Sequence, residues 1–269
     1  MVVLAFFSVC GQVASFSGSH MVTSRAFRSF NLDFYNFSSF NVKAGGLWFN
    51  QVYATRFSFV CSFFFKPFAI FISILGLIYG SFAALRQLDL KRQVAFSSIA
   101  HMSFTTLGIF TFSEAGVKGA IYLMLSHGLT STALFFLVGV LSERFHTRSV
   151  LAYGGLLGAM PLFSFFFIFM NLANIGFPGT SGFIPEFYIL SAVVSDSLYY
   201  LFFVLLGMFL TTAASLTTML RVLFGHLKTV YTQSSWLDLT KVDFFILATI
   251  SFVILFLGLT DVFIPVNTL

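Results

Sequence analysis

Residues 176–186 of the chain read GFPGTSGFIPE, a stretch rich in glycine and proline that interrupts a long apolar segment. Pro178 and Pro185 each remove a backbone donor, so a helix that enters the stretch must stop and restart. The glycines that permit irregular dihedrals there are Gly176, Gly179 and Gly182. Non-helical backbone at membrane depth is tolerated only where protein buries it or where it lines a watery cavity. The stretch therefore predicts a broken membrane helix.

Glu186 ends the stretch, near the start of the resumed helix, where the positive end of the helix dipole favours an anion. A carboxylate beside a broken helix is a common arrangement for ion or proton sites in transporters. The alternative is a loop at the membrane surface, with Glu186 as an ordinary charge at a helix N-terminus.

The composition outside this stretch is that of a membrane protein. Of 269 residues, 58% are hydrophobic and 9% are charged, whereas charged residues make up about a quarter of a soluble domain. With so little charge, the net +5 does not describe a nucleic-acid-binding face. Cys10 and Cys61 lie in apolar runs without a CxxC spacing or nearby ligands, which argues against a disulfide framework or a metal site.

Windows of about 20 apolar residues predict the membrane spans. Six such windows are clear, and a seventh, 44–65, is interrupted by Arg56. Residues 181–195 are the expected second half of the fourth clear window. We therefore predict an all-α bundle of about seven transmembrane helices, one of them broken. The six clear windows are 67–85, 93–112, 117–141, 155–175, 198–220 and 244–260.

The first 42 residues differ from the remainder, 43–269, which forms the predicted bundle. They are rich in Ser, Asn and Phe and carry no acidic residue before Asp33. This segment is either a targeting relic, as its arginines and serines suggest, or a shortened and divergent span. The basic residues between the spans show no clean asymmetry, so the sequence leaves the orientation in the membrane open.

Two histidines lie in the middle of predicted spans, where an ionisable side chain is expensive and therefore a functional candidate. His101 and His127 are each flanked by serines or threonines that can orient the ring. Imidazole titrates near neutrality and has a donor and an acceptor on opposite sides, as a proton relay requires. The alternative is a pair of neutral core histidines. Lys43 precedes two glycines and, taken alone, reads as a lysine snorkelling from a span end.

Several motifs occur in an order that resembles the antiporter-like subunits of mitochondrial NADH:ubiquinone oxidoreductase (complex I). Among these subunits, the motifs resemble the chain 4 subfamily. The resemblance covers residues 43 to about 262. The motifs are KAGG at 43–46, LRQLDLKR at 85–92, AFSSIAHM at 95–102, SHGLTS at 126–131, ERFHTR at 143–148 and GFPGTSGFIPEF at 176–187.

The resemblance implies an inverted-repeat fold with two repeats of five helices, of which this chain looks like the second half. It also implies proton-relay roles for Lys43, His101, His127 and Glu186, in that order. Two departures stand out. The first repeat with its glutamate and lysine has no counterpart here, and Pro185 stands where the family usually has glycine.

The function implied by the resemblance is a proton-translocation half-channel in the membrane arm of complex I, in the mitochondrial inner membrane. No cofactor is expected in this chain, and NADH, FMN, iron–sulfur clusters and ubiquinone are expected elsewhere in the complex. Expected partners are neighbouring antiporter-like subunits, a separate chain with the missing first-half helices, and phospholipids. The alternatives are a structural subunit that has lost pumping and a free-standing cation/proton antiporter.

Overall fold

The structure, a computed structural model, describes residues 60–226 and 238–263, with side chains placed from residue 66 to 259. The predicted N-terminal segment, Lys43 and most of the 44–65 window lie outside the described residues. The chain divides into two compact units, residues 1–71 and 72–269. The interrupted stretch 176–186 and the two mid-span histidines lie in the second unit.

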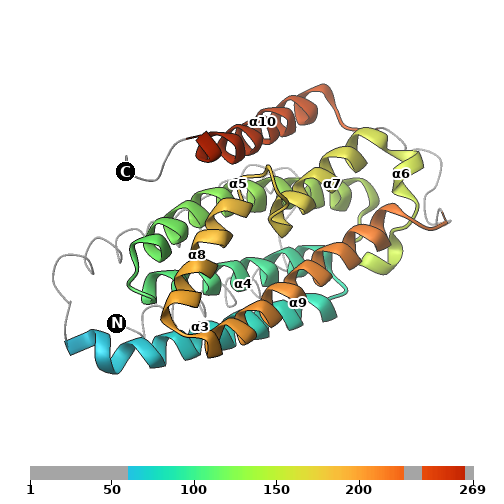
Figure 1. Cartoon of the computed structure of the whole chain (residues 1–269). Coiled ribbons are helices and arrows are strands. Elements are labelled where there is room, and N and C mark those ends of the chain that lie inside the picture. Colours follow the sequence, from blue (N-terminus) through green and yellow to red (C-terminus); the bar gives the residue numbers. More distant parts are fainter. Residues whose placement is uncertain (1–59, 227–237, 264–269) are drawn as a thin grey trace. The chain divides into compact units, whose positions relative to one another are not determined.

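The described residues form helices joined by short connections, with no β-strand among them, which confirms the predicted all-α fold (Figure 1). A short 3₁₀ turn, Val150–Ala152, precedes α6. The helices are α3 Val60–Arg86, α4 Leu90–Phe110, α5 Glu114–Phe145, α6 Leu156–Ala159, α7 Pro161–Ile175, α8 Phe183–Asp196, α9 Leu198–Leu223 and α10 Lys241–Phe263.

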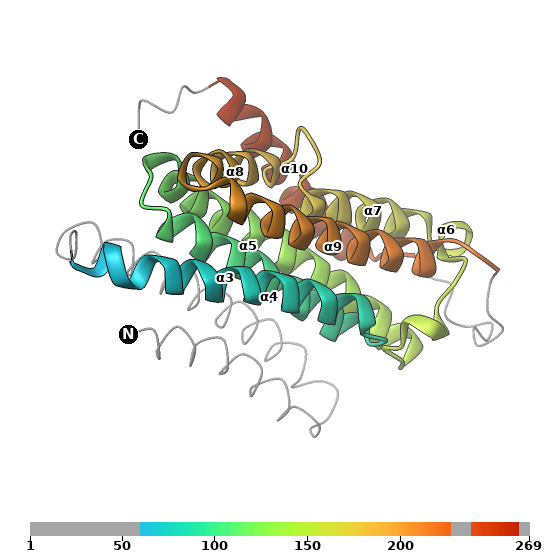
Figure 2. The ribbon, with the colours of Figure 1, turned by 60° about the horizontal axis from the view of Figure 1, so that its bottom comes forward.

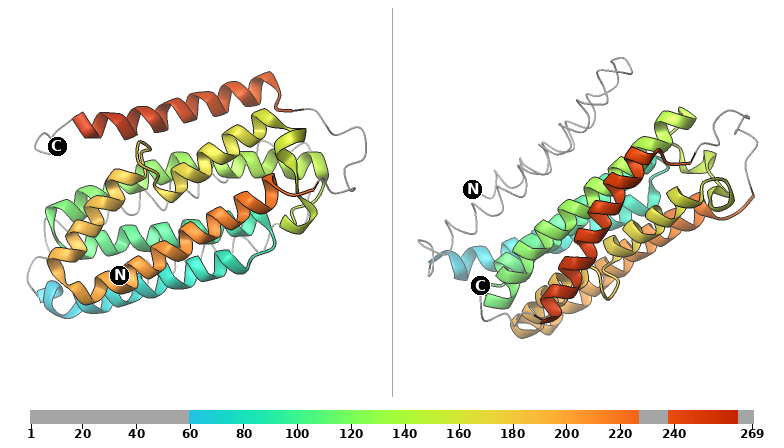
Figure 3. Two further views of the ribbon diagram at one scale, coloured as in Figure 1. Left: turned by 45° about the vertical axis from the view of Figure 1, so that its right-hand side comes forward. Right: turned by 90° about the horizontal axis from the view of Figure 1, so that it is seen from above.

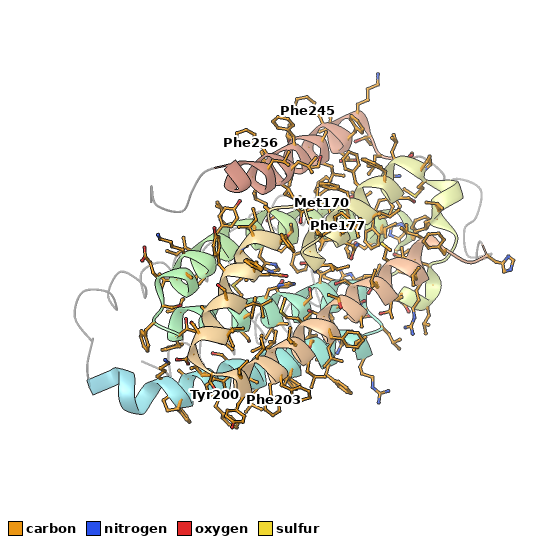
Figure 4. All side chains as sticks on the ribbon, in the orientation of Figure 1. Met170, Phe177, Tyr200, Phe203, Phe245 and Phe256 are labelled. Atoms are coloured by element: carbon orange, nitrogen blue, oxygen red, sulfur yellow. The ribbon has the colours of Figure 1, made fainter. Side chains whose placement is uncertain are left out.

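Among the described residues, four helices are long and apolar enough to cross a membrane, namely α3, α5, α9 and α10. Large apolar side chains face outward on them, as Phe245 and Phe256 do on α10 (Figure 4). Such a surface is stable against lipid rather than water. Within the described part, the chain is therefore a multi-pass membrane protein.

The predicted window 155–175 is divided in the structure. The short α6 ends at Ala159, and α7 begins at Pro161, a position where a missing N–H is no loss to the helix. Helix α4 has 21 residues but is less apolar than the four spanning helices. The cause is one polar face, in which buried polar side chains recur every four residues at Gln93, Ser97, His101 and Thr105.

Small residues allow the helices around the break to approach closely. A methyl group at Gly119 of α5 would lie 2.9 Å from the Tyr188 side chain and 3.0 Å from the Pro185 carbonyl oxygen of α8. At Gly80, which lies on α3 beside α4 (Figure 2), a methyl group would lie 3.0 Å from the Ala100 nitrogen. Such packing of small residues is how helices associate in lipid, where burial of apolar surface gives no drive.

Backbone hydrogen bonds bring one end of α3, α4, α5 and α9 together. The Leu90 amide donates to the Arg148 carbonyl at 3.0 Å, and the Val150 amide donates to Leu88 at 2.7 Å. The Gly155 amide donates to the Phe224 carbonyl at 3.2 Å, which adds the end of α9. We call this region the cationic end. Its described Lys and Arg residues are Arg86, Lys91, Arg92, Arg144, Arg148, Arg221 and, at the start of α10, Lys241.

The opposite end of this unit, at the α4–α5 turn and the α8–α9 junction, has one described lysine, Lys118, beside Glu114 and Asp196. The prediction that the basic residues show no asymmetry is therefore wrong for the described residues of this unit, within 72–263. Motifs far apart in the sequence fall at one end because successive helices run in opposite directions.

Asp238 fastens α10 to the rest of the bundle at the cationic end. Its carboxylate accepts hydrogen bonds from the backbone amides of Leu162 at 2.8 Å and Phe163 at 3.1 Å, in the first turn of α7. The Arg144 guanidinium of α5 donates to the Asp238 carbonyl at 3.1 Å. The residue thus satisfies two amides that α7 leaves without an intrahelical partner.

We predict that Asp238→Ala lowers the stability of the bundle by about 1 kcal/mol, the usual effect of losing a helix cap. Asp238→Asn keeps an acceptor oxygen and is expected to lose less. The measurement is the midpoint of thermal unfolding of the purified protein in its native assembly. Equal midpoints for the parent and Asp238→Ala would show that this cap contributes nothing.

Candidate functional site

The break between α7 and α8 is built from backbone geometry. Helix α7 ends at Ile175, and Gly176, the residue that caps it, has a φ of 79° in the left-handed region that favours glycine. The Phe177 amide donates to Leu172 at 3.1 Å and the Gly176 amide to Ala173 at 3.3 Å, a Schellman motif. Gly179 has a φ of 94°. Pro185 lies in the first turn of α8, where a helix leaves amides without partners anyway.

Helix α10 and α5 cover this break on one side (Figure 3). A methyl group at Gly258 of α10 would lie 2.5 Å from the Gly179 carbonyl oxygen, so only glycine allows this approach. The Tyr122 hydroxyl of α5 donates to the neighbouring Leu257 carbonyl at 2.8 Å. The irregular segment is therefore packed against protein, as the membrane interior requires.

Glu186 lies in the first turns of α8 and is 7% exposed. Its carboxylate points back at the end of α7, because a methyl group at Gly176 would lie 2.5 Å from Oε2. The break thus places a carboxylate at the N-terminus of one half-helix and against the C-terminus of the other.

The two histidines lie beside this carboxylate. His101 Nδ1 of α4 is 3.8 Å from Glu186 Oε1. The rings of His101 and His127, the latter from α5, are stacked with centroids 4.8 Å apart and an interplanar angle of 29°. All three side chains are buried. We call them the His–Glu cluster. His101 contacts both other members.

The His–Glu cluster has the chemistry of a proton-exchange site. A separation of 3.8 Å is an ion-pair distance but is too long for a direct hydrogen bond. A small movement, or one bridging water, would allow a proton to pass between the carboxyl and the imidazole. Imidazole can take the proton on one nitrogen and release it from the other. Since both groups are buried, the charge of each depends strongly on the other.

Further buried polar residues lie in the break and on the neighbouring helices, and of these the sequence had pointed only to Ser97, beside His101, and to Ser181, in the break. Ser181, in the break, is fully buried, and its Oγ has no hydrogen-bond partner among the described residues. Helices α4, α7 and α9 contribute further buried polar groups. The four-residue spacing from Gln93 to His101 was a signal that was open to sequence reasoning. Besides the histidine, the buried polar residues on these three helices are Gln93, Ser97, Thr105, Ser164, Asn171, Asn174, Thr211, Ser215 and Thr218.

The remaining predicted residues are outside this region. Lys43 and Cys10 lie outside the described residues, as does the side chain of Cys61. Within the part of the chain that the structure describes, no group of three or more His, Cys, Asp or Glu side chains is placed to hold a metal ion.

Comparison with known proteins gives the family context. Residues 37–212 match the family described as NADH:quinone oxidoreductase/Mrp antiporter, transmembrane. The chain is 43% identical over 218 residues to NADH-ubiquinone oxidoreductase chain 4 of Chondrus crispus. That alignment covers 81% of this chain and 44% of the relative, so the chain spans less than half the length of that protein.

Solved structures share the fold. A chain of respiratory complex I from Thermus thermophilus superposes with a TM-score of 0.68 at 26% identity, covering 74% of this chain and 41% of that one. A chain of the Mrp complex from Dietzia superposes with a TM-score of 0.72, covering 84% of this chain and 50% of that one. At 17% identity the second likeness concerns the fold alone.

The contact between Gly176 and Glu186 generates a prediction. Gly176→Ala forces a methyl group onto the carboxylate and is expected to displace it from His101. The measurement is the infrared carboxyl band of Glu186 in the native assembly, identified by its loss in Glu186→Gln. We expect this band to shift in Gly176→Ala.

Gly179→Ala is the matched control. Both glycines have positive φ, so both substitutions strain the backbone, but a methyl group at Gly179 meets open space. We expect little shift of the Glu186 band in this control. A shift of equal size in both variants would show that backbone strain, and not the contact with the carboxylate, is responsible.

Proposed function

The chain belongs to the NADH:quinone oxidoreductase/Mrp antiporter transmembrane family, and from this premise we propose that it serves in the membrane arm of a respiratory NADH:quinone oxidoreductase, where it carries protons. The observation that carries the proposal is the His–Glu cluster, in which three buried ionisable side chains from three helices meet at a broken helix. Isolated charges in hydrocarbon are expensive, so a protein retains such a group where it serves transport.

The proton route proposed here uses Glu186, His101 and His127, with Lys43 as a further relay residue by family resemblance. A proton that arrives on His101 makes the imidazole cationic and favours an ionised Glu186 at 3.8 Å. Release of the proton to Glu186 makes both groups neutral. Every transfer breaks one N–H or O–H bond and forms another, so the pair needs no redox partner of its own.

In this proposal, the electron-transfer chemistry takes place in other subunits of the complex. NADH, FMN, iron–sulfur clusters and ubiquinone would be bound by other subunits, and this chain would respond to them through the electrostatics of the membrane arm. Its partners would be the neighbouring antiporter-like subunits, a chain that supplies first-half helices, and phospholipids. The mitochondrial inner membrane is the proposed location, since the chain is 48% identical over 164 residues to NADH-ubiquinone oxidoreductase chain 4 of Arabidopsis thaliana.

We predict that Glu186→Gln, in the assembled complex, lowers the number of protons pumped per NADH oxidised, because the amide cannot accept the proton. The matched control is Glu114→Gln on α5. The Glu114 side chain is 82% exposed and pairs only with Lys118 among the ion pairs of the described residues. We expect this control to pump as the parent does.

The ratio of protons to NADH is measured with the complex in sealed vesicles. A Glu186→Gln complex that assembles and pumps with the ratio of the parent would contradict the proposed role and favour a purely structural subunit. A fall in the Glu114→Gln control as well would attribute the effect to assembly.

The distribution of basic residues also supports an orientation. Lys and Arg concentrate on the inner side of membrane proteins, in short loops next to the spans. In the described part of residues 72–263, seven lie at the cationic end and one at the opposite end. We therefore place the cationic end on the matrix side of the membrane.

Cysteine labelling tests this orientation. With Cys10 and Cys61 replaced by serine, His146→Cys marks the cationic end and Glu114→Cys the opposite end; both positions are exposed. An impermeant thiol reagent added to mitoplasts is expected to label Glu114→Cys and not His146→Cys, whereas permeabilised membranes label both. The reverse pattern in sealed mitoplasts would invert the orientation.

A further inference from the structure

Helix α8 begins with fewer free backbone amides than an ordinary helix. A helix leaves the N–H groups of its first residues without an intrahelical partner, and these groups form the positive end of its dipole. In α8, the Phe183 amide donates to the Thr180 carbonyl at 3.3 Å, and Pro185 has no N–H. Of the first three helical residues, Ile184 alone therefore retains an amide for an anion.

The start of α7 shows what the missing N–H removes. Pro161 is the first residue of α7, so the amides of the second and third residues remain. The Asp238 carboxylate accepts from both of them, Leu162 at 2.8 Å and Phe163 at 3.1 Å. Pro185, in contrast, is the third residue of α8. It therefore removes one of the two amides that a carboxylate caps at α7.

The Glu186 carboxylate lies near the end of α8 toward which such amides point, yet none of them binds it. Helical side chains lean toward the N-terminus, and a methyl group at Gly176 would lie 2.5 Å from Oε2. Gly176 in turn adjoins the N-cap residue of α8, since a methyl group at Gly182 would lie 3.4 Å from its Cα. Among the described residues, no hydrogen bond reaches the carboxylate, and its ion-pair partner is His101 at 3.8 Å.

The remainder of this first turn offers the carboxylate no substitute for the missing amide. Pro185 is buried, and α5 packs on its backbone, because a methyl group at Gly119 would lie 3.0 Å from the Pro185 carbonyl oxygen. Ser181, directly before the N-cap residue, is fully buried, and its Oγ has no hydrogen-bond partner among the described residues. Neither the backbone of this turn nor the neighbouring hydroxyl therefore holds the Glu186 carboxylate away from His101.

We propose that Pro185 is a positioning residue, which leaves the Glu186 carboxylate for exchange with His101 by removing a backbone amide that would otherwise bind it. Hydrogen bonds from an N–H to a carboxylate are about twice as strong as neutral ones. His101 at 3.8 Å makes no direct hydrogen bond to the carboxylate, so an amide in the third position of α8 would compete with the imidazole. The inference rests on the proposed function and gives a role to the proline that stands where the family usually has glycine.

The test restores the N–H at position 185 in the assembled complex, with Pro185→Ala and Pro185→Val. Both variants add the amide, but alanine is smaller than proline and valine is larger, so an effect that they share does not come from side-chain volume. We expect both to shift the infrared band of Glu186, which is identified by its loss in Glu186→Gln. We also expect both to pump fewer protons per NADH than the parent, with ratios between those of the parent and Glu186→Gln.

Pro161→Ala is the matched control. It restores an N–H in the first turn of α7, where the capping carboxylate belongs to Asp238 and not to Glu186. The same change of the backbone therefore occurs away from the His–Glu cluster. We expect the Glu186 band and the pumping ratio of Pro161→Ala to equal those of the parent.

A high-resolution structure of the Pro185→Ala complex is expected to show the new amide within hydrogen-bond distance of the Glu186 carboxylate. Four results would each overturn the positioning role: an unshifted Glu186 band in both Pro185 variants, a shift in one of them alone, an equal shift in Pro161→Ala, or pumping like the parent despite the shift. Poor pumping by Glu186→Gln would then still leave the proposed function standing. Normal pumping by Glu186→Gln would overturn the proposed function, whereas a band shift shared by both Pro185 variants would still show that the missing amide positions the carboxylate.

Discussion

Hydrocarbon offers no hydrogen-bond partner to a backbone amide or carbonyl, and this constraint governs the structure around the break between α7 and α8. The chain can leave the helical conformation at residues 176–182 only because the Schellman motif, the glycine contact from α10 and the start of α8 satisfy or cover that backbone. The same break places the Glu186 carboxylate at a helix N-terminus inside the bundle. A continuous helix would have needed no such cover and would have offered no dipole to the carboxylate.

The His–Glu cluster also requires that the surrounding helices approach one another closely. Gly119 and Gly258 bring α5 and α10 onto α8 and the break. Because the helices touch at glycines, side chains from α4, α5 and α8 can reach one another, and His101 contacts both Glu186 and His127. The cluster therefore depends on residues that carry no chemistry themselves.

The sequence was sufficient to predict the features that depend on local pattern. The break at 176–186 follows from prolines and glycines in one short stretch, and His101, His127 and Glu186 were candidates because an ionisable group inside a span is costly. The spans followed from apolar windows, and their boundaries were wrong mainly where Pro161 starts a new helix after α6. For the residues that the structure describes, each of these predictions could be made from a short continuous segment of the sequence.

Features that depend on distant residues were beyond sequence reasoning. Gly258 meets Gly179 across 79 positions, and no local pattern pairs them. The gathering of Lys and Arg at the cationic end can be recognised only when the direction of each helix is known. In the sequence alone, these residues therefore showed no preference for one side of the membrane. Likewise, buried polar residues of α4, α7 and α9, two from each helix, come together around one small pocket only in the folded chain. On each helix, one Asn, Gln or Ser would pass as an ordinary interhelical hydrogen bond.

The central claim is that His101 and Glu186 act as one proton-exchange unit, and a double-mutant cycle tests it most directly. Pumping by the assembled complex is compared for His101→Gln, Glu186→Gln and the double variant. Residues in contact are expected to be coupled, so the account predicts that the double variant pumps no worse than the more impaired single variant. Losses that multiply in the double variant would contradict it, since His101 and Glu186 would then act independently.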